Sequence, residues 1–198
     1  MGKSGAISIA GTSYNGKNDA ESLIGAAKVD KDAIFETLIS RYSADISRLA
    51  NRLLGWPGDV DDIVQDVFLA AYTGLDKFRG DSEIKTWLFS ITINKCRTNR
   101  YKKMLSLKFL EKFSEKFRGL TVSSASDKPI RDEICESVRS AVSNLPVKYR
   151  EAVVLKYLQE LNTDEIIKIL NISENTLNVR LSRAKKSLSY KLAPLVEE

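Results

Sequence analysis

The stretch NTDEIIKILNISENTLNVRLSRAKK, residues 162–186, decides the architecture of the C-terminal part of the chain. Asn162 followed three positions later by Glu165 is a helix-capping pattern. The apolar residues of the helix that follows share one face to bury: Ile166, Ile169 and Leu170. Asn171 begins a turn, because asparagine tolerates the left-handed backbone conformation, and Ser173 is placed to cap the next helix. Two short helices joined by such a turn predict a helix-turn-helix.

The second of these helices, residues 174–191, carries one acid and five bases, and the bases gather toward its C-terminal half. The bases suit DNA phosphates and complement the helix dipole: Arg180, Arg183, Lys185, Lys186 and Lys191. The N-terminal half offers polar groups that can read base edges in the major groove: Glu174, Asn175, Thr176 and Asn178. Its expected buried side is Leu177, Leu181 and Leu188. Two residues depart from the usual motif, Ile167 in a place for a small residue and Asn171 in a place for glycine. The alternative is a solvated basic helix in an ordinary bundle.

Apolar residues recur at helical spacing through most of the remaining sequence, which predicts an all-α protein. The expected helices cover residues 20–28, 31–54, 60–75, 84–103 and 146–159, besides one that begins near Ile130. Asp59 is the expected N-cap of the third of these. We expect two small helical domains with four segments: a flexible tail (1–18), a first domain (19–103), a partly helical linker (104–129) and a second domain (130–198).

Charge divides sharply within the first domain. Residues 53–76 hold five acids and no base, whereas residues 79–103 hold seven bases and two acids. The helical pattern places one polar set on the face opposite the apolar stripe: Asp61, Asp62, Gln65, Asp66 and Leu69. Acids repel DNA, so this face is either solvated or a docking site for a basic protein. The basic stretch is interleaved with aromatics, which suits unpaired bases; Trp87 is expected in the core, while Phe89 and Tyr101 are left open between core and base stacking.

Composition excludes several classes of function. The net charge of +5 permits nucleic-acid binding without proving it. With no histidine, no glycine-rich phosphate loop and only the distant Cys96 and Cys135, the chain lacks the usual catalytic and zinc-binding sets. We expect both thiols to be buried or half-buried. No cofactor, metal, small-molecule substrate or membrane insertion is expected, and the chain is not expected to be an enzyme.

Two motifs together resemble one family. DVDDIVQDVFLAAYTGLDKFRGDSEIKTWLFSITINKCR (residues 59–97) resembles region 2, and LPVKYREAVVLKYLQELNTDEIIKILNISENTLNVRLSRAKKSL (residues 145–188) resembles region 4, of the extracytoplasmic-function sigma factors. The resemblance covers residues 20–192, with both motifs in the right order. It implies a cytoplasmic initiation factor that directs bacterial RNA polymerase to promoters and melts the −10 element.

The resemblance also implies roles for particular residues. The acidic face Asp61, Asp62, Gln65, Asp66 and Leu69 would dock on the clamp helices of the polymerase largest subunit. The loop Arg79, Gly80, Asp81, Ser82 and Glu83 would capture a flipped −10 base, and Lys85, Asn94, Arg97 and Arg100 would contact the −10 element. Glu174, Asn175, Thr176, Asn178, Arg180 and Arg183 would bind the −35 element. An apolar groove of the second domain would bind the flap of the second-largest subunit, and an anti-sigma factor, often at the membrane, is an expected partner. The linker departs from the family's usual acidic composition, because it is rich in lysine.

Two alternatives remain from the residues alone. A stand-alone helix-turn-helix regulator would bind DNA without polymerase, but such a regulator would have no need of the acidic helix 59–76. A helical bundle that only binds proteins would not need Arg180 and Arg183.

Overall fold

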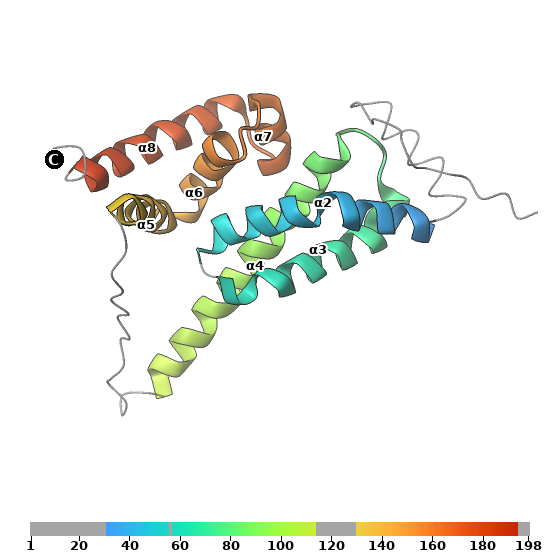
Figure 1. Cartoon of the computed structure of the whole chain (residues 1–198), viewed down its shortest axis with the longest axis horizontal. Helices are drawn as coiled ribbons and strands as arrows, with labels where there is room; N and C mark the ends of the chain where they lie inside the picture. The colour runs from blue at the N-terminus through green and yellow to red at the C-terminus, as the bar shows by residue number, and fades with distance from the viewer. Residues whose placement is uncertain (1–30, 56, 114–129, 194–198) are drawn as a thin grey trace, which may run out of the picture.

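The computed structural model describes residues 31–55, 57–113 and 130–193, and within these ranges every regular element is a helix. The first group comprises α2 (Lys31–Leu54), α3 (Val60–Gly74) and α4 (Ile84–Phe113), with the short turns η1 (Pro57–Asp59) and η2 (Leu75–Lys77). The second group comprises α5 (Ile130–Ser143), α6 (Val147–Val153), the π-helical turn η3 (Val154–Leu158), α7 (Thr163–Leu170) and α8 (Glu174–Leu192). The all-α prediction is confirmed (Figure 1).

Helices α2, α3 and α4 form a bundle around aliphatic side chains spaced three or four residues apart. Ile46, Leu49 and Leu54 of α2, Val67 of α3 and Leu88 of α4 have exposed fractions of 0%. Burying one such side chain contributes about 1.5–3 kcal/mol. Beyond this bundle the C-terminal half of α4 projects alone (Figure 1).

The second group packs its helices around α8. Helices α5 and α6 lie against α8, and α7 turns back over the start of α8 (Figure 1). Leu155, Ile166 and Leu177 fill the space between them, with exposed fractions of 0%, 0% and 1%. Helix α8 therefore buries one side against the other helices of this group and exposes residues of its opposite side to solvent.

The two groups are not independent bodies in this structure. Helix α7 packs against α4, and α5 and η3 lie against α2. The buried apolar residues of both groups form one continuous cluster. A sequence pattern that predicts two separate domains does not predict this shared core.

Several sequence predictions need correction. Helix α4 continues to Phe113, ten residues past its expected end at 103, and so forms the helical part expected of the linker without a break from the first domain. Asp59 does not cap α3 with its side chain but forms an ion pair with Lys103, Oδ2 to Nζ 2.7 Å. Cys96 is buried as expected, whereas Cys135 is exposed on α5. The helix expected at 20–28, the tail 1–18 and the rest of the linker, 114–129, lie outside the described residues.

Candidate nucleic-acid and polymerase interfaces

The helix-turn-helix is built by local hydrogen bonds. Asn162 Oδ1 accepts from the Glu165 amide at 2.9 Å, and Glu165 Oε2 accepts from the Asn162 amide at 2.8 Å, a complete capping box. Asn171 has φ 51° and ψ 57°, the left-handed conformation that ends α7. Ser173 Oγ accepts from the Thr176 amide at 3.3 Å and starts α8. All three sequence predictions for this motif are confirmed.

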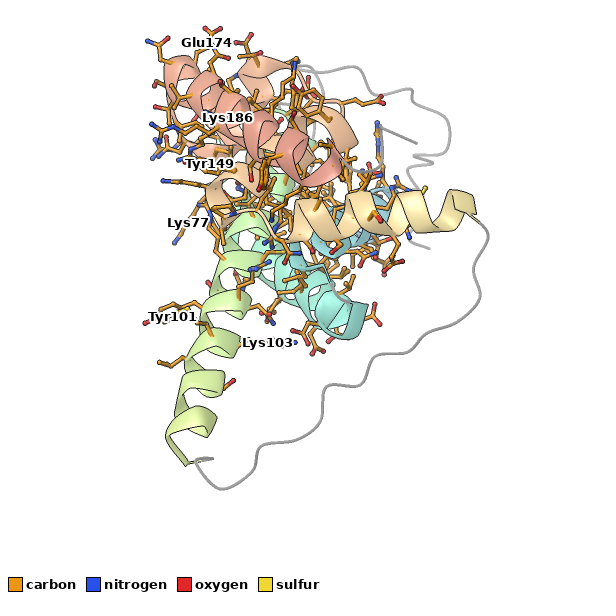
Figure 2. The ribbon with its side chains drawn as sticks, turned by 90° about the vertical axis from the view of Figure 1, so that its left-hand side faces the viewer. Lys77, Tyr101, Lys103, Tyr149, Glu174 and Lys186 are labelled. Atoms are coloured by element: carbon orange, nitrogen blue, oxygen red, sulfur yellow. The ribbon has the colours of Figure 1, made fainter. Side chains whose placement is uncertain are left out.

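Helix α8 presents the predicted −35 residues away from the core. Leu177 and Ala184 form its buried side, while Leu181 and Leu188 are only half-buried. The exposed members of the predicted set are Glu174, Asn175, Thr176, Asn178 and Arg183, and Arg180 is half-buried. Figure 2 shows Glu174 at the outer tip of the helix and Lys186 farther along it. Ala184 is fully buried although it was not among the residues expected on this side, because alanine carries little weight in an apolar pattern.

A tyrosine that the sequence analysis did not select lies beside this helix. Tyr149 of α6 accepts a hydrogen bond on its hydroxyl oxygen from Nη1 of Arg183, at 3.4 Å. That hydrogen bond, with the charges of Lys148, Arg183 and Arg180, lowers the pKa of Tyr149. No local pattern signals this contact, because Tyr149 and Arg183 are 34 residues apart.

The acidic face of α3 is exposed as the helical pattern predicts. Asp61, Asp62, Gln65 and Asp66 are all exposed, and Leu69 is 63% exposed. The opposite side of α3 supplies the core: Val60, Ile63, Val67, Phe68 and Ala71. The face is not purely acidic in space, because Lys95 Nζ of α4 lies 3.7 Å from Asp66 Oδ2. A shallow groove between α3 and α4 brings Asp62 and Asp66 next to Asn94 of the predicted −10 set.

The predicted base-capturing loop lies at the start of α4. Arg79, Asp81 and Glu83 are exposed, Ser82 is half-buried, and Gly80 has φ 77°, which favours glycine. Phe78 and Trp87 pack under this loop with ring centroids 4.9 Å apart. Of the aromatics, Phe89 is fully buried and belongs to the core, and Trp87 is half-buried against it. Tyr101 is 61% exposed on the projecting part of α4, so base stacking stays a prediction for this residue (Figure 2).

The residues predicted to contact the −10 element differ in how firmly the protein itself engages them. Asn94 is exposed and accepts a hydrogen bond from Arg97 Nη1 at 3.4 Å, and Lys85 is half-buried with Nζ 3.9 Å from Asp45 Oδ2. Arg97 and Arg100 also bond to other helices. Arg100 donates to the carbonyl oxygens of Leu53 and Leu54 at 3.2 and 3.5 Å, and burial lowers its pKa.

Arg97 forms a two-pronged ion pair with Glu151 of α6. Arg97 Nε donates to Oε1 and Nη2 donates to Oε2, both at 2.7 Å. The Glu151 side chain is 4% exposed and that of Arg97 is 40% exposed. The hydrogen bonds to Glu151 raise the pKa of Arg97. This pair joins the two helical groups and lay beyond sequence prediction, because its residues are 54 positions apart.

A second arginine reinforces the same boundary. Arg150 is 3% exposed and donates to the Leu53 carbonyl at the end of α2 at 2.9 Å. Its other bonds go to the carbonyls that end α5, those of Val142, Ser143 and Leu145. Arg52 of α2 donates in return to the Leu158 carbonyl of η3. These bonds satisfy helix-end carbonyls that would otherwise be buried without donors.

Other kinds of site are not found in the described ranges. No group of three or more His, Cys, Asp or Glu side chains there could hold a metal ion. No helix in the same ranges has the length and apolar character needed to cross a membrane.

Two family models and several curated relatives match this chain. The sigma-70 region 2 family model matches residues 38–104, and the sigma-70 region 4 model matches residues 135–188. The chain is 32% identical to the ECF RNA polymerase sigma factor SigW of Bacillus subtilis, over 85% of this chain and 93% of that protein. It is 30% identical to the ECF RNA polymerase sigma-E factor of Escherichia coli K12, over 82% of this chain and 88% of that protein.

Solved structures show the same fold. CnrH in complex with the cytosolic domain of CnrY matches with a TM-score of 0.63 and 28% identity, over 88% of this chain and 97% of that one. RpoE of Bartonella quintana, in complex with the anti-sigma factor NepR, matches with a TM-score of 0.59 and 22% identity, over 80% of this chain and 96% of that one. With an acidic exposed helix in the part that matches region 2, a helix-turn-helix in the part that matches region 4, and relatives matched over nearly their full length, the chain belongs to the extracytoplasmic-function sigma factors of the sigma-70 family.

Proposed function

We propose that this protein binds core RNA polymerase through the acidic face of α3 and directs it to promoters through α8 and the start of α4. The observation that carries the proposal is the separation of charge: α3 exposes Asp61, Asp62 and Asp66, while α8 exposes Arg183, Lys185 and Lys186. One surface suits a basic protein and the other suits DNA. A stand-alone DNA-binding regulator has no use for the first surface.

Helix α8 would enter the major groove at the −35 element. Asn175 and Asn178 are exposed near its start, where a recognition helix contacts base edges. Each good two-pronged contact discriminates against a wrong base by about 1–3 kcal/mol. The bases farther along would hold phosphates and fix the register of the helix on the duplex.

The loop 79–83 and α4 would act at the −10 element. Opening a duplex costs on average about 1.4 kcal/mol per step, and extruding a base costs a few kcal/mol. Exposed polar groups of the loop and the exposed Tyr101 ring would offset these costs by binding unpaired bases. The protein adds no chemical step; polymerase performs catalysis.

Arg97 and Arg100 can join −10 binding only after a rearrangement. Their guanidinium groups bond to Glu151 and to the end of α2 in the structure. We therefore interpret this arrangement as the form of the protein that has not engaged a promoter. Polymerase would favour release, because it holds the two helical groups at separate promoter elements.

An anti-sigma factor is the expected regulator. CnrH and the Bartonella RpoE were solved with CnrY and the anti-sigma factor NepR respectively, and this chain shares their fold. An inhibitor that stabilised the contact between the two helical groups would keep Arg97 and Arg100 from DNA.

Reconstituted transcription tests the proposal. Core polymerase, this protein and a library of promoter-like duplexes are combined, and the run-off transcripts are sequenced. Transcripts that start downstream of a shared −35/−10 pair, only with the protein present, are expected. Absence of transcripts, together with tight sequence-specific binding by the protein alone, would instead favour a stand-alone regulator.

The polymerase contact is tested separately by Asp62→Lys. This variant is expected to lose polymerase binding and transcription while its helical circular dichroism stays intact. Glu36→Lys is the matched control, because Glu36 is an exposed acid on α2 outside the acidic face. Equal polymerase binding by the two variants would contradict the assignment of this face.

A further inference from the structure

Cationic side chains gather around Tyr149 where α6 meets α8, and one of them, Arg183, bonds to the tyrosine hydroxyl. Arg183 Nη1 donates to this hydroxyl oxygen at 3.4 Å, and Lys148 Nζ lies 5.3 Å from the Tyr149 ring centroid. Arg180 lies one helical turn before Arg183 on α8, and its charge also acts on the tyrosine. The two helices thus bring together residues from separate parts of the sequence.

These cations lack the partners that cations have elsewhere in the protein. Lys31, Lys95, Arg97 and Lys103 each form an ion pair with an aspartate or glutamate. Among the described residues, no carboxylate lies within ion-pair distance of Lys148, Arg180 or Arg183. Neighbouring positive charges repel one another, and a bound anion would relieve this repulsion.

The tyrosine also keeps a hydrogen-bond donor to spare. Because its oxygen accepts from Arg183, its own O–H hydrogen is directed elsewhere, and no described residue accepts it. The ring is half-buried and packs against the core cluster, so the hydroxyl is held in a fixed position. A hydroxyl in a fixed position, with Arg183 bonded to it and Lys148 near the ring, suits a phosphodiester, whose two non-bridging oxygens both accept hydrogen bonds.

The position beside α8 identifies that anion as DNA backbone phosphate. Glu174 begins α8, and Tyr149 contacts Arg183, nine residues farther along this helix; Figure 2 shows Lys186 and Tyr149 below Glu174. When the start of a recognition helix contacts bases, the neighbouring strand passes such flanking residues. Tyrosine hydroxyls, arginines and lysines are ordinary donors to DNA phosphates.

We propose that Lys148 and Tyr149 of α6, together with Arg183 of α8, form a binding site for a backbone phosphate next to the −35 base-reading surface. The site rests on the proposed function of α8. Its role is positioning: it fixes how far α8 inserts along the groove and reads no base. Helix α6, outside the helix-turn-helix itself, thereby becomes part of the DNA interface.

Holoenzyme binding to two duplexes of equal length tests the site. One duplex carries the promoter selected by reconstituted transcription, the other a random sequence, and affinity is measured at several KCl concentrations. The variants are Lys148→Gln and Tyr149→Phe. The sequence contains a matched control, since the same Lys-Tyr pair recurs at Lys156 and Tyr157. Tyr157 is 60% exposed, and the hydrogen bond of Arg183 goes to Tyr149.

Phosphate binding makes a distinctive pattern. Lys148→Gln is expected to reduce the slope of log K against log[salt] by about 1 and to weaken both duplexes by the same factor. Tyr149→Phe is expected to weaken both by about 3- to 10-fold, the loss of one hydrogen bond, with the slope unchanged because no charge is removed. Lys156→Gln and Tyr157→Phe are expected to change neither quantity.

Three results would overturn the proposal, and they are distinguishable. The first is that Lys148→Gln and Tyr149→Phe leave the affinity for DNA and its salt slope unchanged, while Arg180→Ala still weakens binding to the promoter duplex. This result would reject the phosphate site and leave the −35 role of α8 in place. Loss confined to the selected promoter would assign base reading to Tyr149 instead. Wild-type holoenzyme that does not distinguish the two duplexes would reject the proposed function and the site with it.

Discussion

The ion pair between Arg97 and Glu151 predicts how strongly the two helical groups hold together. Glu151→Gln keeps the shape of the side chain but removes the charge that accepts two hydrogen bonds of 2.7 Å from Arg97. Hydrogen bonds to charged groups contribute about 1.5–3 kcal/mol each. Breaking a buried ion pair costs about 3–5 kcal/mol. The Arg97 side chain is 40% exposed, so water replaces part of the loss.

We therefore expect a cost of about 2 kcal/mol, below the range for a fully buried pair. If the whole cost acts on the contact between the groups, the equilibrium shifts toward separation by about 30-fold, since 1.4 kcal/mol is a factor of ten. The released Arg97 side chain is then available to DNA. Stability should fall while DNA binding by the free protein rises.

A double-mutant cycle with Arg97→Gln and Glu151→Gln measures the coupling by urea unfolding. Binding of each variant to a labelled single-stranded −10 oligonucleotide is measured in parallel without polymerase. Glu151→Gln should bind more tightly than wild type, whereas Arg97→Gln should not. Arg48 and Asp45 supply the control cycle: these side chains, three residues apart on α2, are 58% and 27% exposed, so they should couple by no more than about 1 kcal/mol, and Lys85, which also approaches Asp45, is left unchanged.

A coupling energy for Arg97 and Glu151 no larger than that of the control pair would show that the contact does not hold the groups together. Strong coupling between Arg97 and Glu151, with oligonucleotide binding unchanged in Glu151→Gln, would show that the pair stabilises the fold but does not keep Arg97 from DNA. Either result would refute the interpretation of the closed arrangement.

Three other outcomes follow from single sites. Asn171→Ala should destabilise the protein by about 1–2 kcal/mol in urea unfolding, because Asn171 holds φ 51°, while Asn171→Gly should be tolerated; equal losses for both would contradict a backbone cause. Cys135 should react quickly with maleimide at neutral pH and Cys96 only on unfolding, because Cys135 is exposed and burial raises the pKa of Cys96 to about 12; equal labelling rates would argue against a buried Cys96. Since the folded protein keeps the Cys96 proton that the unfolded chain loses, stability should fall as pH rises from about 9 toward 12, and Cys96→Ala should flatten that part of the stability profile.

Local patterns determined much of this protein. The capping box, the left-handed turn at Asn171 and the Ser173 cap join residues no more than three positions apart or fix a single residue, so the sequence alone predicts them. The acidic face of α3 follows in the same way from the 3.6-residue period of a helix. The roles of the individual polymerase, −10 and −35 residues stay predictions, because they depend on partners.

Contacts between distant residues were decided only by the tertiary structure. Arg97 and Glu151 are 54 residues apart, Arg150 and Leu53 are 97 apart, and Tyr149 and Arg183 are 34 apart. A charge pattern shows that a basic residue is present but not whether it faces DNA or a carboxylate of another helix. Packing of the second helical group on α4, through α7, makes that choice, because it places Glu151 of α6 within reach of a helix whose sequence alone indicates a free nucleic-acid surface.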